Sequence, residues 1–592
     1  MGSDLLDKLF TMPSVASQFL ALTVGGLAAL SSASFLSSQL DLDPYPYDFP
    51  VLGANGSDLF PMRLCNGFKL EEASIDDIQA QIEAGTFTGV QLLQCYLERI
   101  YQVQPYVNSV LQFNPDAMAI AEALDKEREQ GIVRGPLHSI PFLVKDNIGS
   151  KDKMETTAGS WALVGSVIPR DSHVVHLLRK AGAVLLGHAT LSEWADMRSN
   201  DYSEGYSGRG GQARNPYNFT VNPGGSSTGS AVSVTSNQVP FALGTETDGS
   251  VINPAERNNI VGIKPTVGLT SRAGVIPETL HQDSVGCFGK TVRDAVYCLD
   301  AIYGVDSLDN YTLAQEGNTP DGGYAQFLTN QSALEGAVFG LPWLSFWQYN
   351  DAEQNAQLME LLELIESAGA TIINGTELPH YKEIVDPAGW NWDYGTTRGY
   401  PNESEYTYVK VDFYNDIAQY LSYLNNTKMR SLEDIVQYNY DNAGSEGGYP
   451  GVMPAFASGQ DGFLASLATK GIRNETYWQA LEFCRHTSRE EGIDAALRYK
   501  GQNLTALLTP PDFGPTYEIA AQAGYPVVSL PAGINKASKM PYGLSLMGTA
   551  WSETTLIKYA SAIEDLQLSS GTPWQRSLAT WSGYMDRNIP VN

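Results

Sequence analysis

Helix-like and strand-like hydrophobic patterns alternate along most of this chain, and this alternation limits the folds available to it more than any other feature. Near the start of the pattern, Ile75, Ile78 and Ile82 repeat with the spacing of one helix face. Ser74 can cap this helix and Gly85 can end it. A helix is therefore predicted between these two residues.

Further helices and strands follow in turn. Two more helices are predicted before the first strand, one starting at Thr88 and one over residues 115–131. Short apolar runs predict strands at residues 140–144, 183–186, 239–243, 506–508, 527–530 and 543–547. Helices are expected at residues 173–181, after Gly229 and at residues 552–565. This interleaving predicts an α/β fold with a largely buried sheet covered by helices (α/β/α).

The chain has the composition of one large globular unit. It holds 592 residues, of which 43% are hydrophobic and 17% are charged, enough for a sizeable buried core. No Pro/Ser-rich linker or run of charge divides it. We therefore predict a single large domain over residues 45–585.

Acidic residues outnumber basic ones, giving a formal net charge of -29 at pH 7. Such a surface repels phosphate groups and anionic lipids, which argues against nucleic acid or a membrane surface as a partner. We expect a neutral or cationic small molecule as substrate and no stable membrane insertion. The sequence is also compatible with a homodimer.

Residues 1–33 resemble a secretory signal peptide. The apolar run 19–30 is too short to span a bilayer but suits the central region of a signal, and small residues follow at 31–33. The segment before this run lacks the usual net positive charge, because Asp4 and Asp7 offset Lys8. The alternative is an N-terminal extension on a cytoplasmic protein.

N-glycosylation sequons support the secretory alternative. Nine occur, at Asn55, Asn218, Asn310, Asn330, Asn374, Asn402, Asn425, Asn474 and Asn503. The five cysteines, Cys65, Cys95, Cys287, Cys298 and Cys484, show no metal-binding spacing, and their odd number leaves at least one without an internal partner. We expect a secreted glycoprotein with small buried cysteines and one or two disulfides.

Residues 385–450 are rich in tryptophan, tyrosine and phenylalanine. An aromatic cluster on a sheet enzyme can line a substrate pocket or form a lid over it. It can equally be the ordinary core of a helical subdomain, and the sequence favours neither interpretation.

A Gly/Ser-rich segment formally matches a nucleophile motif. Residues 225–229 fit G-x-S-x-G, which would make Ser227 the nucleophile of an α/β-hydrolase. That motif needs a strand directly before it, and Pro223 would break such a strand. His281, His380 and His486 stand in no distinctive context, so this interpretation is disfavoured. No metal motif, Walker loop or dinucleotide fingerprint is found, and we expect no metal or nucleotide cofactor.

A constellation without histidine fits better. Lys145 ends an apolar strand, Ser226 lies in the Gly/Ser loop before a predicted helix, and Ser250 ends a turn after the strand 239–243. Strand ends are where α/β proteins place their sites.

Three runs carry a family resemblance: "GPLHSIPFLVKDN", "NPGGSSTGSA" and "GTETDGSVINPA". Together with "AGYPVVSLPAGINKASKMPYGLSLMG" they resemble the amidase signature family of serine hydrolases, over roughly residues 72–570. The resemblance implies the amidase signature fold, a mixed central β-sheet covered by α-helices (α/β/α), with a helical part at 72–135 and a signature core at 136–310. It also implies a Ser-Ser-Lys triad, with Ser250 as nucleophile and Ser226, after a cis peptide, relaying its proton to Lys145.

The chain departs from the family pattern near the nucleophile. Asp248 and Gly249 stand where the family usually has two glycines, Ile252 replaces an arginine, and Thr228 replaces a glycine. Backbone N–H groups of Thr247, Asp248, Gly249 and Ser250 are the expected oxyanion donors. A carboxylate at position 248 would oppose that role unless it points away.

The proposed chemistry places one demand on the lysine. Lys145 can act as a base only when it is neutral, so its pKa must fall by about 3 units, which burial can achieve. We expect a serine amidohydrolase that cleaves a linear carboxamide or anilide through an acyl-enzyme. The alternatives are an esterase on the same triad, a subunit that supplies ammonia to a partner, and an inactive secreted glycoprotein.

Overall fold

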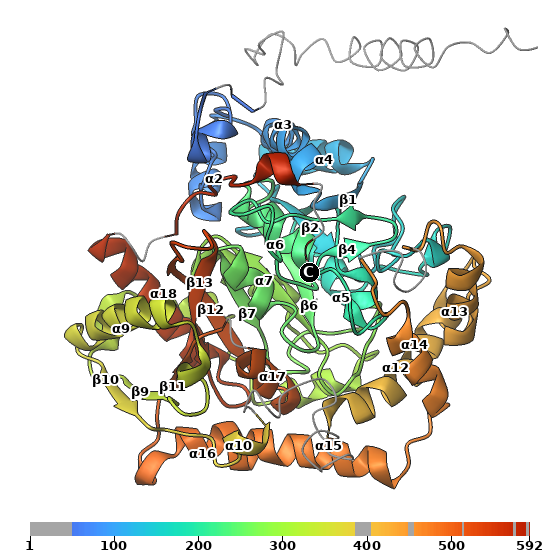
Figure 1. Cartoon of the computed structure of the whole chain (residues 1–592). Helices are drawn as coiled ribbons and strands as arrows, with labels where there is room; N and C mark the ends of the chain where they lie inside the picture. Colours follow the sequence, from blue (N-terminus) through green and yellow to red (C-terminus); the bar gives the residue numbers. More distant parts are fainter. Residues whose placement is uncertain are drawn as a thin grey trace, which may run out of the picture.

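The computed structural model describes residues 50–51, 53–384, 404–447, 455–511, 514–571, 576–587 and 591. Within these ranges, eleven strands form one mixed sheet in the order β1-β3-β2-β6-β8-β7-β12-β13-β11-β9-β10 (Figure 1). The strands are β1 Val110–Phe113, β2 Pro141–Lys145, β3 Val184–Ala189, β6 Phe241–Glu246, β7 Val261–Lys264, β8 Ser284–Gly289, β9 Val338–Leu341, β10 Thr371–Asn374, β11 Ala506–Thr509, β12 Val527–Ile534 and β13 Pro541–Met547. A separate pair joins β4 Tyr206–Ser207 and β5 Gly211–Gln212.

Helices cover both faces of the sheet, as the sequence predicts. Phe142 and Val144 of β2 point into a core shared with α8 and α18, whereas Leu143 between them points into a core shared with α4 and α6. The described helices are α2 Ile75–Glu83, α3 Gly89–Val107, α4 Ala117–Glu129, α5 His173–Lys180, α6 Thr228–Thr235, α7 Ile252–Arg257, α8 Val292–Ile302, α9 Ala352–Ser367, α10 Tyr381–Ile384, α12 Glu405–Tyr423, α13 Leu432–Asp441, α14 Asp461–Thr469, α15 Glu475–Ser488, α16 Asp494–Leu497, α17 Gly514–Ala523 and α18 Glu553–Ser570. The α/β/α prediction is confirmed.

One local prediction is wrong. The sequence places three helices before the first strand, but β1 lies between α3 and α4 and pairs antiparallel with β3. Of its four residues only Val110 is buried, so the strand lacks the fully buried run that marks the central strands. Its hydrogen bonds come from β3, a partner distant in sequence.

The described part of the aromatic-rich segment forms a helical unit beside the sheet. Tyr408, Phe413 and Tyr420 of α12 are buried in a second hydrophobic core with α13, α14 and α15 (Figure 1). Four of the predicted cluster's aromatics, Trp390, Trp392, Tyr394 and Tyr400, lie outside the described residues. Tyr408, Phe413 and Tyr420 are therefore core, whereas Tyr423 and Tyr440 are exposed, and a lid function stays a prediction.

Features that bear on compartment are only partly within the described ranges. The predicted signal peptide, residues 1–33, lies outside them. Cys65 and Cys95 form a disulfide, while Cys287, Cys298 and Cys484 are buried and belong to no disulfide. Among the described helices, none combines the length and apolar character needed to cross a membrane.

Candidate active site

Lys145, Ser226 and Ser250 meet at one edge of the sheet. Lys145 is the last residue of β2, and Ser250 lies in the turn that follows β6. These two strands are parallel neighbours, so their carboxyl ends reach the same edge. Ser226 lies just before α6, which packs against both strands. The structure thus brings the three predicted residues together.

Hydrogen bonds join the three side chains in a chain. Lys145 Nζ donates to Ser226 Oγ at 2.7 Å, and Ser226 Oγ donates to Ser250 Oγ at 2.9 Å. The ammonium also donates to the Thr245 carbonyl of β6 at 3.2 Å. Lys145 and Ser226 are fully buried and Ser250 is 5% exposed, so only the serine at the end of the chain approaches solvent.

Two glycines permit the close packing around the serines. The Gly225–Ser226 peptide bond is cis, and a Cβ at Gly225 would lie 1.9 Å from a carboxylate oxygen of Glu204. Gly249 has a φ of +78°, and a Cβ there would lie 2.4 Å from the Tyr517 ring. Larger residues would displace the walls of the site.

Burial lowers the pKa of Lys145 from 10.5 to about 8, against the opposing effect of Glu278, Asp196, Glu204 and Glu246. Lys264 and Lys290 are also buried with pKa values of about 8. Lys264, however, donates to backbone carbonyls, and Lys290 donates to the Asn237 side chain. A lowered pKa alone does not distinguish Lys145; of these three lysines, it is the one that donates to Ser226.

Glu246 fixes the turn of residues 247–250, called the nucleophile turn because it carries the predicted nucleophile Ser250. The sequence analysis did not single out Glu246. Its Oε2 accepts hydrogen bonds from the N–H groups of Val251 at 2.7 Å and Ile252 at 2.9 Å. Its carboxylate also faces the N–H of Gly249. The residue stands within the "TETDGS" motif, but only the folded turn shows that it holds the backbone on both sides of Ser250.

Asp248 has the setting of a neutral carboxyl. Burial raises its pKa well above the usual range, and the negative neighbours Glu405, Glu246, Glu278 and Asp196 raise it further. Glu405 begins α12, more than a hundred residues along the chain. The sequence analysis required this carboxylate to point away from the oxyanion; protonation removes the conflict without that condition.

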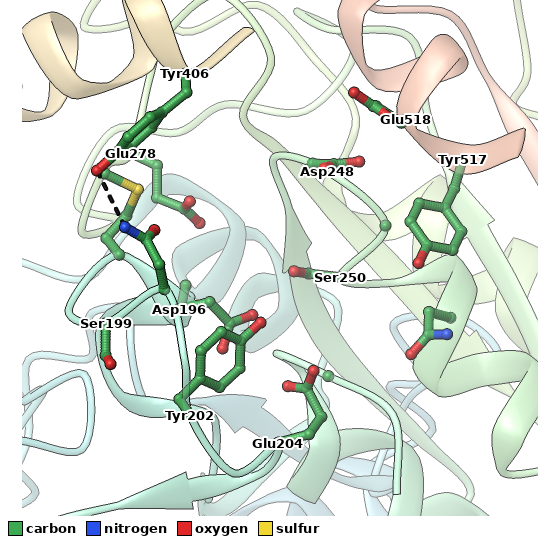
Figure 2. Close-up of a pocket in the computed structure, with 16 residues that line it drawn as sticks. Asp196, Ser199, Tyr202, Glu204, Asp248, Ser250, Glu278, Tyr406, Tyr517 and Glu518 are labelled. Carbon is green, nitrogen blue, oxygen red and sulfur yellow. Dashed lines mark hydrogen bonds between the residues drawn. The ribbon is translucent and has the colours of Figure 1, made fainter. Parts of the chain in front are cut away.

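Ser250 opens into a cavity of about 320 Å³. Figure 2 shows Ser250 between Asp248 and the group of Asp196, Tyr202 and Glu204. The lining residues are Ala195, Asp196, Met197, Ser199, Asn200, Tyr202, Glu204, Gly225, Asp248, Gly249, Ser250, Asn253, Glu278, Tyr406, Tyr517 and Glu518. From the aromatic-rich segment, Tyr406 of α12 contributes to this wall.

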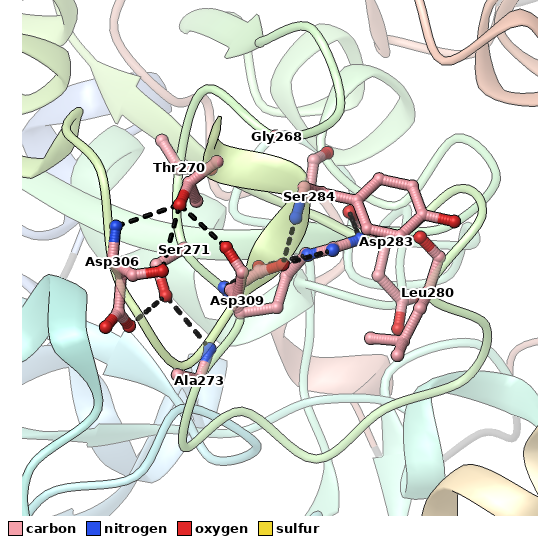
Figure 3. A network of polar contacts seen from close by, with 12 residues as sticks. Gly268, Thr270, Ser271, Ala273, Leu280, Asp283, Ser284, Asp306 and Asp309 are labelled. Atoms are coloured by element: carbon pink, nitrogen blue, oxygen red, sulfur yellow. Dashed lines mark hydrogen bonds and ion pairs between the residues drawn. The ribbon is translucent and has the colours of Figure 1, made fainter. Parts of the chain in front are cut away.

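The loop between β7 and β8 brings Glu278 to the cavity, and an ion pair anchors that loop. Arg272 donates two hydrogen bonds to Asp309, from Nε at 2.6 Å and from Nη2 at 2.7 Å (Figure 3). Further along the loop, Glu278 and Asp283 contact Thr247 of the nucleophile turn. Thr247 Oγ1 lies 2.9 Å from Glu278 Oε1 and 2.6 Å from Asp283 Oδ1. The nucleophile turn and this loop are therefore held together.

The alternative nucleophile Ser227 does not line the cavity, and neither do His281, His380 and His486. Ser227 Oγ instead donates to the Thr245 carbonyl at 3.0 Å.

A buried chain of hydrogen bonds that the sequence analysis did not foresee joins Ser150 to His188 at 2.9 Å and His188 to Asp146 at 2.8 Å. Because Asp146 follows Lys145 directly, this chain fixes the end of β2 beside the proposed base.

Comparison with known proteins gives one consistent result. The family model described as Amidase matches residues 91–445. A Schizosaccharomyces pombe protein named as an amidase is 53% identical, over 99% of this chain and 100% of its own length. An Arabidopsis thaliana protein, also named as an amidase, is 40% identical over 86% of this chain and 93% of its own.

A solved structure shares the same architecture. The native peptide amidase from Stenotrophomonas maltophilia is 36% identical and superposes with a TM-score of 0.74. The superposition covers 86% of this chain and 99% of that chain. The likeness therefore extends over nearly the whole of the solved protein.

Proposed function

Since this chain belongs to the amidase family and is a hydrolase acting on amide C–N bonds, we propose that it cleaves linear carboxamides through a triad of Lys145, Ser226 and Ser250. The observation that carries the proposal is the unbroken chain from Lys145 Nζ through Ser226 Oγ to Ser250 Oγ, with Ser250 facing the cavity. A serine becomes a useful nucleophile when a base accepts its proton, and this chain supplies the base.

The acylation step begins when Lys145 loses its proton. The two hydrogen bonds can then reverse, so that Ser250 donates to Ser226 and Ser226 donates to the neutral amine. Ser250 Oγ attacks the carbonyl carbon of the amide while its proton passes to Ser226 and the Ser226 proton passes to Lys145. The tetrahedral intermediate places its negative charge on the former carbonyl oxygen.

The nucleophile turn is the proposed oxyanion site. Backbone N–H groups from Thr247 to Ser250 supply its donors, and each good donor in such a site contributes about 3 kcal/mol. Gly249 shares its N–H with Glu246, which leaves Thr247, Asp248 and Ser250 as the stronger candidates. A neutral Asp248 keeps negative charge away from this oxygen.

The reaction closes by returning the protons. As the C–N bond breaks, the Lys145 ammonium returns a proton through Ser226 to the leaving nitrogen, which departs as ammonia or an amine. A water molecule then attacks the Ser250 ester, giving up its proton through Ser226 to Lys145. Collapse of the second intermediate releases the carboxylic acid and restores the serine.

The experiment that tests the proposal measures ammonia release from a panel of primary carboxamides, including C-terminal peptide amides because of the likeness to a peptide amidase. Wild-type protein should hydrolyse members of the panel, and Ser250→Ala should reduce the rate at least a thousandfold. Equal rates from both proteins would refute the proposed nucleophile. Anilides and matched esters in the same panel measure whether the triad works mainly as an esterase.

A further inference from the structure

The wall of the catalytic cavity carries an unusual excess of carboxyl groups. Five of the sixteen lining residues are acidic, whereas none of those sixteen is lysine, arginine or histidine. The acidic members are Asp196, Glu204, Asp248, Glu278 and Glu518. They come from separate segments of the chain and surround Ser250 on several sides (Figure 2).

Among the described residues, neither Asp196 nor Glu278 forms an ion pair, although the Ser192 and Tyr202 hydroxyls form hydrogen bonds with Asp196. Lys145 lies behind the wall, but the proposed chemistry needs it neutral, and Arg257 adds positive charge near Glu204. Asp196 Oδ1 is buried without a hydrogen-bond partner among the described residues. The negative form of Glu278 is favoured by the charge of Lys145 and by a hydrogen bond from the Thr247 hydroxyl, which also contacts Asp283.

An unpaired buried carboxylate is costly, and this cost shows in the acid–base behaviour of the wall. Burial raises the pKa values of Asp196 and Glu278 well above the usual range, with neighbouring acidic groups adding to the effect. A cation placed among these groups would recover Coulomb energy in a poorly screened site. An anion in the same place would recover no such energy and would be repelled by every wall carboxyl group that is ionised.

Given the proposed amide hydrolysis, on which this inference rests, we propose that the enzyme selects carboxamides whose acyl part carries an ammonium or guanidinium group, and that Asp196 and Glu278 bind this cation. The acyl part must hold the charge because ammonia, the leaving group of a primary carboxamide, brings no further substituent. Lysine-like and other aminoalkyl amides are thus the favoured class.

An organic cation fits this wall better than a metal ion. Within the described residues, no group of three or more His, Cys, Asp or Glu side chains is arranged to hold a metal. Tyr202, Tyr406 and Tyr517 also line the cavity and can pack against the alkyl stem of an aminoalkyl chain. The carboxyl groups then serve as separate contacts for one ammonium group.

The test compares amides that differ only in charge. γ-Aminobutyramide is paired with valeramide, in which a methyl group replaces the terminal ammonium. Nα-acetyl-lysinamide is paired with Nα-acetyl-norleucinamide, in which a hydrogen atom replaces the side-chain ammonium and the α-nitrogen carries no charge. Succinamate supplies an anionic chain of similar size. The assays run in ~0.5 M salt, where the Debye length is only a few ångströms, so that the overall net charge adds little attraction.

The expected result is a kcat/KM at least tenfold higher for the cationic member of a pair, with succinamate the poorest substrate. Asp196→Asn should lower the cation-to-neutral ratio at least threefold; asparagine keeps the size of the side chain and tolerates the φ of 83° at this position. Glu278→Gln should lower the ratio as well, which provides a second variant if the first folds poorly. Glu122→Gln, an exposed residue of α4, should leave it unchanged.

Calorimetry on Ser250→Ala separates this inference from the proposed reaction. That variant should bind γ-aminobutyramide more tightly than valeramide, and adding Asp196→Asn should remove the difference. Amide hydrolysis with a ratio of one or below in both pairs would overturn the inference alone. Charge-selective binding by Ser250→Ala, with no amide hydrolysed by wild type, would overturn the proposed reaction and leave the cation site standing.

Discussion

At the scale of single residues, the three proposed catalytic groups could be predicted because together they match motifs of the amidase signature family, although each local landmark alone is common. Lys145 ends an apolar strand, and both serines sit in glycine-containing turns. The state of Asp248 could not be found in this way. Its raised pKa depends on burial and on Glu405 and Glu278, which reach it only through the fold.

The lowered pKa of Lys145 sets the expected pH dependence. Only the neutral amine accepts a proton, so kcat/KM for a neutral amide should rise with pH and level off above about 8, the pKa to which burial lowers this group. Rates of valeramide hydrolysis between pH 5 and 10 measure this rise. Lys264→Met, which removes another buried lysine of similar pKa, should leave this rise of kcat/KM with pH unchanged. A profile that is flat across this range would exclude Lys145 as the titrating base.

At the scale of helices and strands, the parallel pair β2 and β6 was within reach of sequence reasoning, because both are continuous apolar runs in an alternating pattern. The edge strand β1 was not, since only Val110 of its four residues is buried. The loop that carries Glu278 was also beyond prediction. It owes its position to Arg272 and Asp309, which are 37 residues apart in sequence.

The Arg272–Asp309 pair should contribute strongly to stability. Both side chains are almost fully buried, and burial alone would raise the pKa of Asp309, but hydrogen bonds and the charge of Arg272 hold it below its usual value. Asp309→Asn should lower the free energy of unfolding by about 3 kcal/mol, because it leaves a buried guanidinium without its counter-charge. Urea unfolding measures the change. Asp321→Asn, at an exposed site, is the control; equal midpoints for the two variants would show that the pair does not anchor the loop.

At the scale of the whole molecule, the alternating pattern was enough to predict one α/β/α unit, but not which cysteines pair or what the aromatic-rich segment does. The Cys65–Cys95 disulfide joins the segment before α2 to α3. Most described sequon asparagines are exposed: Asn55, Asn310, Asn330, Asn374, Asn425, Asn474 and Asn503. Asn218 is partly buried, and Asn402 lies outside the described residues.

These features support the proposal that the protein passes through the secretory pathway. Protein expressed in a eukaryotic cell should lose mass on treatment with an N-glycosidase. Denatured without reduction, it should show three reactive thiols, since Cys287, Cys298 and Cys484 belong to no disulfide, and reduction should add the two from the disulfide. Five thiols before reduction, together with an unchanged mass, would favour the cytoplasmic alternative. Sedimentation of the same sample would show whether the homodimer left open by the sequence exists.

The central claim is that an uncharged Lys145 activates Ser250 through Ser226, and one measurement tests it most directly. A fluorophosphonate reagent forms a covalent bond to an activated serine, and intact-protein mass spectrometry follows the rate of that reaction. Wild-type protein should react at Ser250 with a rate that rises with pH through about 8, whereas Lys145→Met should react at least a hundredfold more slowly while keeping the thermal unfolding temperature of the wild type. Labelling of Ser250 at the wild-type rate in Lys145→Met would contradict the account.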